Sequence, residues 1–150
     1  MTTDTAGVAT QDVIDLLLDQ HEVVKALMTR IAADRGADRD TAFAALADLL
    51  ERHEQGEQTV VHPAVKELET REIAEERMTE EQAADKDLAE LRKLGVDSPE
   101  FDARFSEFRS AVLAHAEREE QVEFPLLRQT LDGDVLMRMA IELREAQGMA

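Results

Sequence analysis

The sequence predicts an all-α fold, an up-down-up-down bundle of four helices followed by a short fifth helix. Its 150 residues are enough for one domain with a single core. Hydrophobic residues make up 43% of the chain, yet it has only five Phe and neither Trp nor Tyr. A core of Leu, Val, Ile, Ala and Met favours helix over strand. Apolar residues also recur every three to four positions in long stretches with short connections, as in a bundle.

The N-terminal part predicts the first helix. We expect residues 1–9 to be disordered, the bundle to occupy residues 10–130, and a short helix or tail to occupy residues 131–150. Thr10 is the expected N-cap of a helix over about residues 11–33. Its apolar stripe also contains His21, which therefore points inward; the stripe comprises Ile14, Leu17, Leu18, Val24, Leu27, Met28 and Ile31.

The next two helices follow a predicted loop at residues 36–40. The second helix should begin near Asp38 and place His53 and Glu57 on its apolar face. We expect a kink at Pro63, because proline lacks the backbone amide that a helix needs. The third helix should begin at Ile73 or Thr79, end at Leu94 and be capped by Gly95. Its apolar side comprises Ala84, Leu88 and Leu91.

The fourth helix has a strong start signal in Ser98-Pro99-Glu100, which offers a cap, a first-turn proline and an acid near the helix dipole. Its apolar face carries His115 and Glu119, and Pro125 marks a second kink. A fifth helix is expected over residues 135–146, where Leu136, Met139, Ala140 and Leu143 form one apolar side.

One motif occurs twice in register. His53-x-x-x-Glu57 returns as His115-x-x-x-Glu119 at a distance of 62 positions (115 − 53), and each copy is followed by a proline. Residues four apart lie on one face of a helix. Buried His and Glu side chains are costly unless a metal or a hydrogen-bond network satisfies them. Together with the inward His21, the repeat predicts the two halves of a dinuclear metal site. Its imidazole and carboxylate ligands suit iron, manganese or zinc.

The overall charge narrows the classes of partner. The formal net charge is −17, from 34 acidic against 17 basic residues, so the surface repels nucleic acids and anionic membranes. The chain has no cysteine and therefore no thiolate ligand. It has no long apolar run and no signal-peptide pattern, so we expect a cytoplasmic protein without a membrane span.

The pattern of histidines and glutamates resembles that of hemerythrin-like proteins of the HHE cation-binding family, over about residues 11–130. Members of that family hold a non-haem di-iron centre inside a four-helix bundle. The resemblance implies two iron ions with an oxo or hydroxo bridge. It also implies that Glu57 and Glu119 bridge the irons, with His21, His53 and His115 as terminal ligands.

The third helix departs from the family pattern because it has no histidine. Alignment on Leu88 and Leu91 puts Glu81 where the family has that histidine, whereas the local run Glu80-Glu81-Gln82 would choose Gln82. Helical periodicity favours Glu81, with Asp85 one turn later as a further oxygen ligand. The predicted set is therefore His21, His53, Glu57, Glu81, His115 and Glu119. His62 is off the apolar stripe and is expected at the surface or between helices.

The resemblance implies a protein that binds or reacts with dioxygen or hydrogen peroxide, in oxygen or redox binding, in sensing or in peroxide breakdown. A di-iron oxidase or oxygenase acting on a small molecule, or a protein of iron storage and homeostasis, is the alternative. Besides dioxygen or hydrogen peroxide, a small-molecule substrate or a redox partner is the expected partner. No residue outside the ligand set is assigned a catalytic role, so the sequence leaves open whether the protein is an enzyme.

Overall fold

The computed structural model describes residues 11–68 and 71–148, and these residues are helical with short connections, as predicted. Residues 1–9 and Thr10, the expected disordered segment and N-cap, lie outside the described residues. The elements are α2 (Val13–Ala33), α3 (Gly36–Gly56), the π-helical turn η1 (Glu57–Val61), α4 (His62–Lys66), α5 (Arg71–Leu94), α6 (Phe101–Arg118), the π-helical turn η2 (Glu119–Glu123), α7 (Phe124–Thr130) and α8 (Gly133–Ala146).

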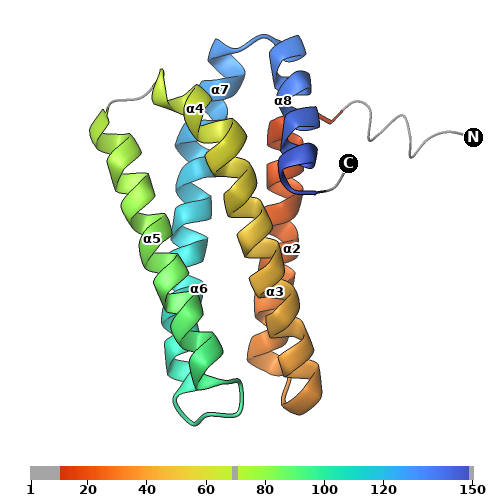
Figure 1. The fold of residues 1–150 in the computed structure, drawn as a ribbon, viewed down its shortest axis with the longest axis vertical. Helices are drawn as coiled ribbons and strands as arrows, with labels where there is room; N and C mark the ends of the chain where they lie inside the picture. The colour runs from red at the N-terminus through yellow and green to blue at the C-terminus, as the bar shows by residue number, and fades with distance from the viewer. Residues whose placement is uncertain (1–10, 69–70, 149–150) are drawn as a thin grey trace, which may run out of the picture.

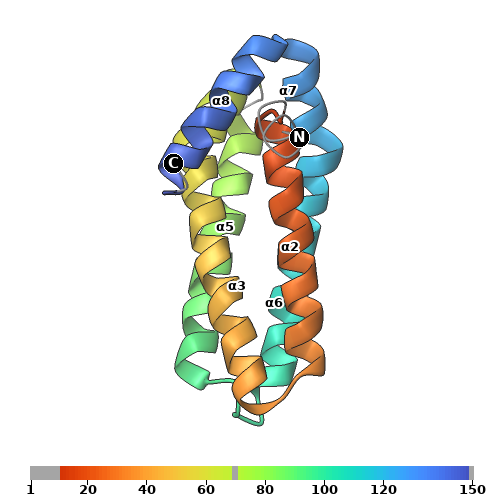
Figure 2. The same ribbon diagram turned by 90° about the vertical axis from the view of Figure 1, so that its right-hand side faces the viewer.

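The long helices lie lengthwise beside one another. In Figure 1, α2 pairs with α3 and α5 pairs with α6, and the two helices of each pair are in contact. The segments α3, η1 and α4 follow one another without a break, and so do α6, η2 and α7. Figure 2 shows α8 crossing obliquely over the upper part of the molecule, where it packs on α2, α3 and η1.

Several predicted boundaries shift for local reasons. The expected loop at residues 36–40 is wrong: Gly36 has φ +65°, so the chain reverses through Asp34 and Arg35 alone and α3 begins at Gly36. The helix α2 is capped by Asp12, whose carboxylate accepts a 2.9 Å hydrogen bond from the backbone N–H of Asp15.

The third and fourth helices also begin elsewhere than predicted. The helix α5 begins at Arg71, ahead of both predicted starts, and it ends before Gly95, whose φ of +83° suits the predicted cap. The helix α6 begins only at Phe101, because the residues from Ser98 to Glu100 form a turn in which the Ser98 carbonyl accepts from the Phe101 N–H.

A π-helical turn follows each copy of the repeated motif. It begins at Glu57 in one copy and at Glu119 in the other, and the carbonyl of that glutamate accepts from an N–H five residues later, that of His62 or Phe124. The prolines at the expected kinks come one residue after these donors and cannot donate to a normal helical bond. The predicted disturbance therefore takes the form of a widened turn, a feature often found at functional sites.

Two apolar clusters make up the core, one in each half of the molecule. The lower cluster joins α2, α3, α5 and α6 and is centred on Met28, Ile31, Leu46, Phe101 and Phe105. The upper cluster joins the start of α2 with η1, α4, α7 and α8 and is centred on Val13, Leu17, Val61, Leu127 and Leu143. Three continuous helical runs contribute to both clusters: α2, α3 with η1 and α4, and α6 with η2 and α7. The histidine that each run contributes to the predicted site (His21, His53 and His115) falls between its residues of the two clusters.

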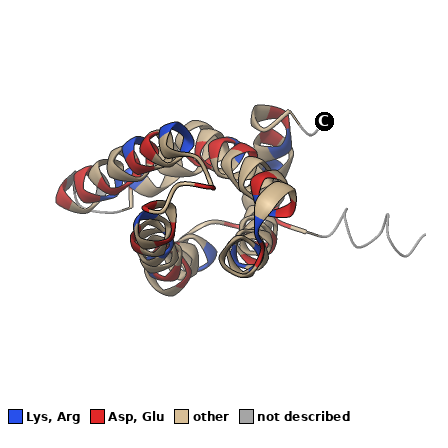
Figure 3. Cartoon of the chain, turned by 90° about the horizontal axis from the view of Figure 1, so that it is seen from below, with Lys and Arg blue, Asp and Glu red and all other residues tan. Residues whose placement is uncertain are grey.

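The charged residues cover the outside of the helices. Figure 3, seen along the bundle from below, shows Asp and Glu on every helix in view, with Lys and Arg between them. None of the described helices is long and apolar enough to cross a membrane.

Candidate metal centre

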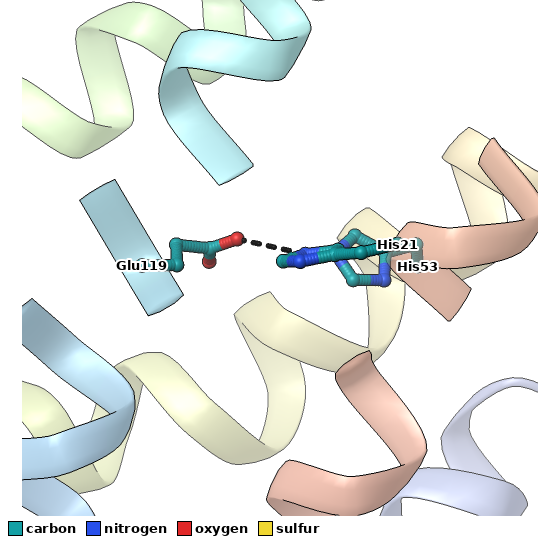
Figure 4. Close-up of side chains that lie close together, drawn as sticks. All are labelled: His21, His53 and Glu119. Atoms are coloured by element: carbon teal, nitrogen blue, oxygen red, sulfur yellow. Dashed lines mark ion pairs between the residues drawn. The ribbon is translucent and has the colours of Figure 1, made fainter. Parts of the chain in front are cut away.

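Two groups of side chains, all buried except the partly buried His115, meet between the apolar clusters. The first group consists of His21 from α2, His53 from α3 and Glu119 from η2, and one ligand atom of each lies within 4.8 Å of the others. The Nε2 atom of His21 is 3.2 Å from Oε1 of Glu119, and the two imidazole rings lie 5.0 Å apart between centroids. Figure 4 shows the Glu119 carboxylate pointing across the interior towards both rings.

The second group consists of Glu57 from η1, Glu81 from α5 and His115 from α6, again with ligand atoms within 4.8 Å of one another. The Nε2 atom of His115 lies 3.8 Å from the Glu81 carboxylate. The two groups adjoin, because Nε2 of His53 is 3.1 Å from Glu57 and Nε2 of His115 is 3.9 Å from Glu119. We call the groups the upper-chain triad (His21, His53, Glu119) and the crossed triad (Glu57, Glu81, His115).

Each copy of the motif contributes to both triads. His53 and Glu57 lie on one helix face but belong to different triads, and so do His115 and Glu119. A spacing of four residues thus places one residue of each motif in each triad. The two motif carboxylates also hydrogen-bond to each other. They lie where a bridge between two cations would be needed.

The structure brings all six predicted ligand residues into the two triads. On α5 it is Glu81 that faces the interior, with 7% of its surface exposed, whereas Gln82 and Asp85 are exposed. His62 lies closer to the site than expected: its Nε2 atom is 2.9 Å from Oε2 of Glu81 and its side chain is 22% exposed. It therefore sits at the margin of the crossed triad.

All three triad histidines are oriented in the same way. The Nδ1 atom of His21 is 2.7 Å from Glu120, that of His53 is 2.8 Å from the side-chain oxygen of Gln20, and that of His115 is 3.0 Å from Glu80. A carboxylate or amide oxygen can only accept, so each Nδ1–H donates and each Nε2 of the neutral ring keeps its lone pair. This arrangement fixes imidazole ligands around metal ions in proteins.

The interior-facing atoms of the triads have unmet bonding capacity. Buried polar atoms without a hydrogen-bond partner are rare in folded proteins. Oε2 of Glu81 lies 2.9 Å from the His62 ring. Among the described residues, four atoms without a partner belong to the triads: His21 Nε2, Glu57 Oε2, His115 Nε2 and Glu119 Oε1. Such atoms cost free energy when buried unless a ligand satisfies them. Nitrogen and oxygen donors converging from four helices therefore fit one metal ion in each triad.

The electrostatics of the paired carboxyls lead to the same conclusion. Burial and the neighbouring Glu57 raise the pKa of Glu119 well above its usual value. Burial alone would also raise the pKa of Glu57, but His53 and the hydrogen bond with Glu119 lower it overall. Among protein groups alone, one proton held between two carboxyls relieves their repulsion. A cation between them would relieve it more completely.

Sequence reasoning did not find the residues that support the ligands. Glu80 and Glu120 each stand next to a ligand in the chain, but acidic residues are too common here for that to be a signal. Gln20 is held in turn by Gln147, just beyond α8, through two amide hydrogen bonds of 2.8 and 3.0 Å. A buried ion pair between Arg77 of α5 and Glu123 of η2, at 3.1 Å, lies near the crossed triad, since Glu123 interacts electrostatically with Glu57 and His115.

Comparisons with known proteins agree with this geometry. A family model described as the hemerythrin HHE cation binding domain matches residues 12–127. The fold is similar to the crystal structure of a hemerythrin HHE cation binding domain-containing protein from Mycobacterium kansasii. The TM-score is 0.79 and the identity 20%, over 92% of this chain and 88% of the other. At that identity the likeness shows the fold alone. A search of curated proteins found no match.

Proposed function

The chain belongs to the hemerythrin HHE cation-binding domain family, and from this premise we propose that it is a non-haem di-iron protein that binds or reacts with dioxygen or hydrogen peroxide. One iron would be held by the upper-chain triad and the other by the crossed triad. The carboxylates of Glu57 and Glu119 would bridge the two positions, since each lies beside the histidine of the other triad.

One observation carries the proposal. Three imidazoles from three helices, two of them buried and that of His115 18% exposed, all turn Nδ1 towards an acceptor and Nε2 towards a shared interior. A polar core that only hydrogen-bonded to itself would use both ring nitrogens, whereas the Nε2 atoms of His21 and His115 have no hydrogen-bond partner among the described residues. The donor set of imidazole and carboxylate, without thiolate, is one that iron accepts.

The protein's own residues would bind, orient and shield the centre. Iron at the two triads would supply Lewis acidity and electrons for oxygen or peroxide chemistry. The supporting residues Gln20, Glu80 and Glu120 hold the rings in place, and the apolar clusters above and below limit the access of water.

The test is metal content per chain by elemental analysis, with absorption spectra of the same sample before and after oxygen or peroxide is added. We expect about two irons per chain, one for each triad, and a near-ultraviolet band that responds to oxidant. Zinc, or no metal, with a silent spectrum would contradict the proposal. Peroxide consumption measured on the iron-loaded protein separates peroxide breakdown from reversible binding.

Two histidine variants locate the metals. His53→Ala removes a ligand from the upper-chain triad and should halve or abolish the iron content. His62→Ala should keep two irons, because His62 contacts Glu81 and belongs to neither triad. If His62→Ala loses iron as strongly as His53→Ala, the assignment of the crossed triad is wrong.

A second candidate function, the oxidation of a small organic molecule with dioxygen, is favoured by one specific observation. A cavity of about 290 Å³ opens beside the triads. Dioxygen and hydrogen peroxide have only two non-hydrogen atoms each, whereas a cavity of about 150 Å³ already binds benzene. Both molecules are therefore far smaller than this space.

A further inference from the structure

The cavity beside the triads lies between the two helix pairs. Its walls come from α2 and α3 on one side and from α5 and α6 on the other, and it is open to solvent rather than enclosed. Its lining includes all six residues of the two triads, so its volume includes the space in front of them. The rest of its wall is mainly apolar, with Val24, Leu50, Ala84, Leu88, Phe108 and Val112 as the principal residues.

The size of the cavity suits an organic molecule. Small-molecule sites in proteins begin at about 300 Å³, and an apolar cavity of about 150 Å³ is enough to bind benzene. A space of about 290 Å³ therefore holds a molecule of roughly ten non-hydrogen atoms. The aliphatic and aromatic wall favours a ring or a short branched chain over a polar solute.

The charges around the cavity act against anions. Glu80, Asp85 and Asp87 contribute carboxylates to its lining, and the whole chain carries a formal charge of −17. Glu54 also lines it, but burial and a hydrogen bond with Asp85 raise the pKa of Glu54 to about 9, so it adds no charge at neutral pH. The two cations of the lining are already engaged: Lys25 pairs with Glu22 at 3.0 Å, and Arg118 pairs with Glu80 and, at 3.4 Å, with Glu76. A carboxylate or phosphate on the ligand would thus meet repulsion without a free partner.

We propose that this cavity binds a neutral, largely apolar organic molecule, with the buried end of the ligand facing the two triads. The inference rests on the proposed function only in making that molecule a substrate of the metal centre. Binding itself needs the cavity and not the iron.

The experiment uses indole as the probe and the full chain without added metal. The chain has neither Trp nor Tyr, so indole fluorescence can be read without protein background. Transfer of indole into an apolar wall should shift its emission to shorter wavelength in a saturable titration. Indole-3-carboxylate has the same ring with a negative charge, and it should bind at least about tenfold more weakly if the acidic rim selects against anions.

A matched pair of variants on α5 locates the binding. Ala84→Leu adds a side chain to the cavity wall and should weaken indole binding at least about fivefold, because the added carbons occupy the ligand's space. Ala89→Leu makes the same change on the exposed side of the helix, away from the cavity, and should bind indole like the unchanged protein. Val112→Phe, from α6, repeats the filling test should Ala84→Leu fail to fold.

Three results would overturn the inference: no saturable indole binding, equal binding by the cavity-filling and control variants, or equal binding of indole and its carboxylate. The metal analysis of the same preparations keeps this failure separate from that of the proposed function. If the chain binds indole but takes up no iron, the cavity is a ligand site and the di-iron function is wrong. If the chain takes up two irons but does not bind indole, the di-iron function stands and the inference about the cavity is wrong.

Discussion

At the residue scale, the proposed centre would depend on the partners of its ligands as much as on the ligands themselves. Each triad histidine is held through Nδ1 by one acceptor from a neighbouring turn or helix. The acceptors differ: two are carboxylates and one is the amide of Gln20. A carboxylate raises the basicity of the ring more than an amide does.

The acceptor for His21 offers a direct test. Glu120→Ala removes the 2.7 Å partner of Nδ1 and should lower iron affinity about 10–100-fold, measured by competition with a chelator. Glu120→Gln keeps an acceptor oxygen and should lose less. Glu117→Ala removes an exposed acid from the same helical segment and serves as the control. An equal effect of the control would mean that net charge, and not the hydrogen bond, sets the affinity.

Five of the six proposed ligands could be read from the sequence because they belong to a repeated motif or an apolar stripe. Glu81 needed the helical period, which separated it from the adjacent Gln82. The supporting residues could not be found in this way, since their role depends on which helices become neighbours. Gln58, for example, matches Glu120 in the repeat, yet Gln58 is exposed and His53 is supported by Gln20 instead.

At the element scale, α8 is part of the support of the centre. Gly56 ends α3 where α8 crosses it, and a Cβ there would lie 2.5 Å from Leu143 and 2.8 Å from the side-chain nitrogen of Gln147. Only glycine permits this approach, through which Gln147 reaches Gln20 and so His53. The sequence predicted α8 as a helix, but nothing in its apolar pattern indicated this link.

Substitution at the crossing should therefore affect both stability and metal binding. Gly56→Ala should lower the free energy of unfolding by about 1–3 kcal/mol, the usual cost of overpacking, in urea denaturation. It should also weaken iron binding, because Gln147 is displaced. Gly133→Ala, at the start of α8, meets no atom within 4 Å and should leave both unchanged. Unaltered stability of Gly56→Ala would show that α8 does not dock on α3 at this point.

The opposite end of α3 is fixed by a charge pair. The guanidinium of Arg39, which is 4% exposed, donates to Asp102 of α6 and stacks over Phe101. The hydrogen bond from Arg39 lowers the pKa of Asp102. A carboxyl whose pKa is lower in the folded state stabilises the fold above its unfolded pKa, and that contribution is lost as the pH falls through the folded value.

The expected result is a pH-dependent loss of stability. Asp102→Asn should lower the Tm at pH 7, and the difference from the unchanged protein should shrink as the pH falls below about 4, near the unfolded pKa of an aspartate. Asp97→Asn, an exposed change in the preceding loop, should have little effect at either pH. A difference that stays constant with pH would show that the charge of Asp102 is not what matters.

At the scale of the whole molecule, the centre is a polar layer between two apolar clusters. The all-α class followed from composition and period, because these set which faces must be buried. The π-helical turns and the cavity between the helix pairs could not be predicted, since both arise only when the helices pack together. The layer holds three buried glutamates, Glu57, Glu81 and Glu119, whose mutual repulsion opposes folding until cations neutralise it.

Metal removal should therefore weaken the fold markedly. Iron present at about 1,000 times its Kd would stabilise the folded state by about 4 kcal/mol, which corresponds to roughly 10 °C in Tm for a chain of this size. Chelation followed by thermal unfolding measures the difference, and return of iron should restore the Tm. A Tm that is unaffected by chelation would mean that the polar layer satisfies itself.

The two-cluster core also has a kinetic consequence. Each cluster is built from several helices and can hold its own segments together, whereas the layer between them has little apolar contact to resist opening. Without metal, the molecule should behave as two cooperative units joined at the ligand turns. Amides around η1 and η2 should exchange with solvent sooner than those on either side. Metal loading should merge the two units into one, so that the exchange rates of the upper and lower halves converge.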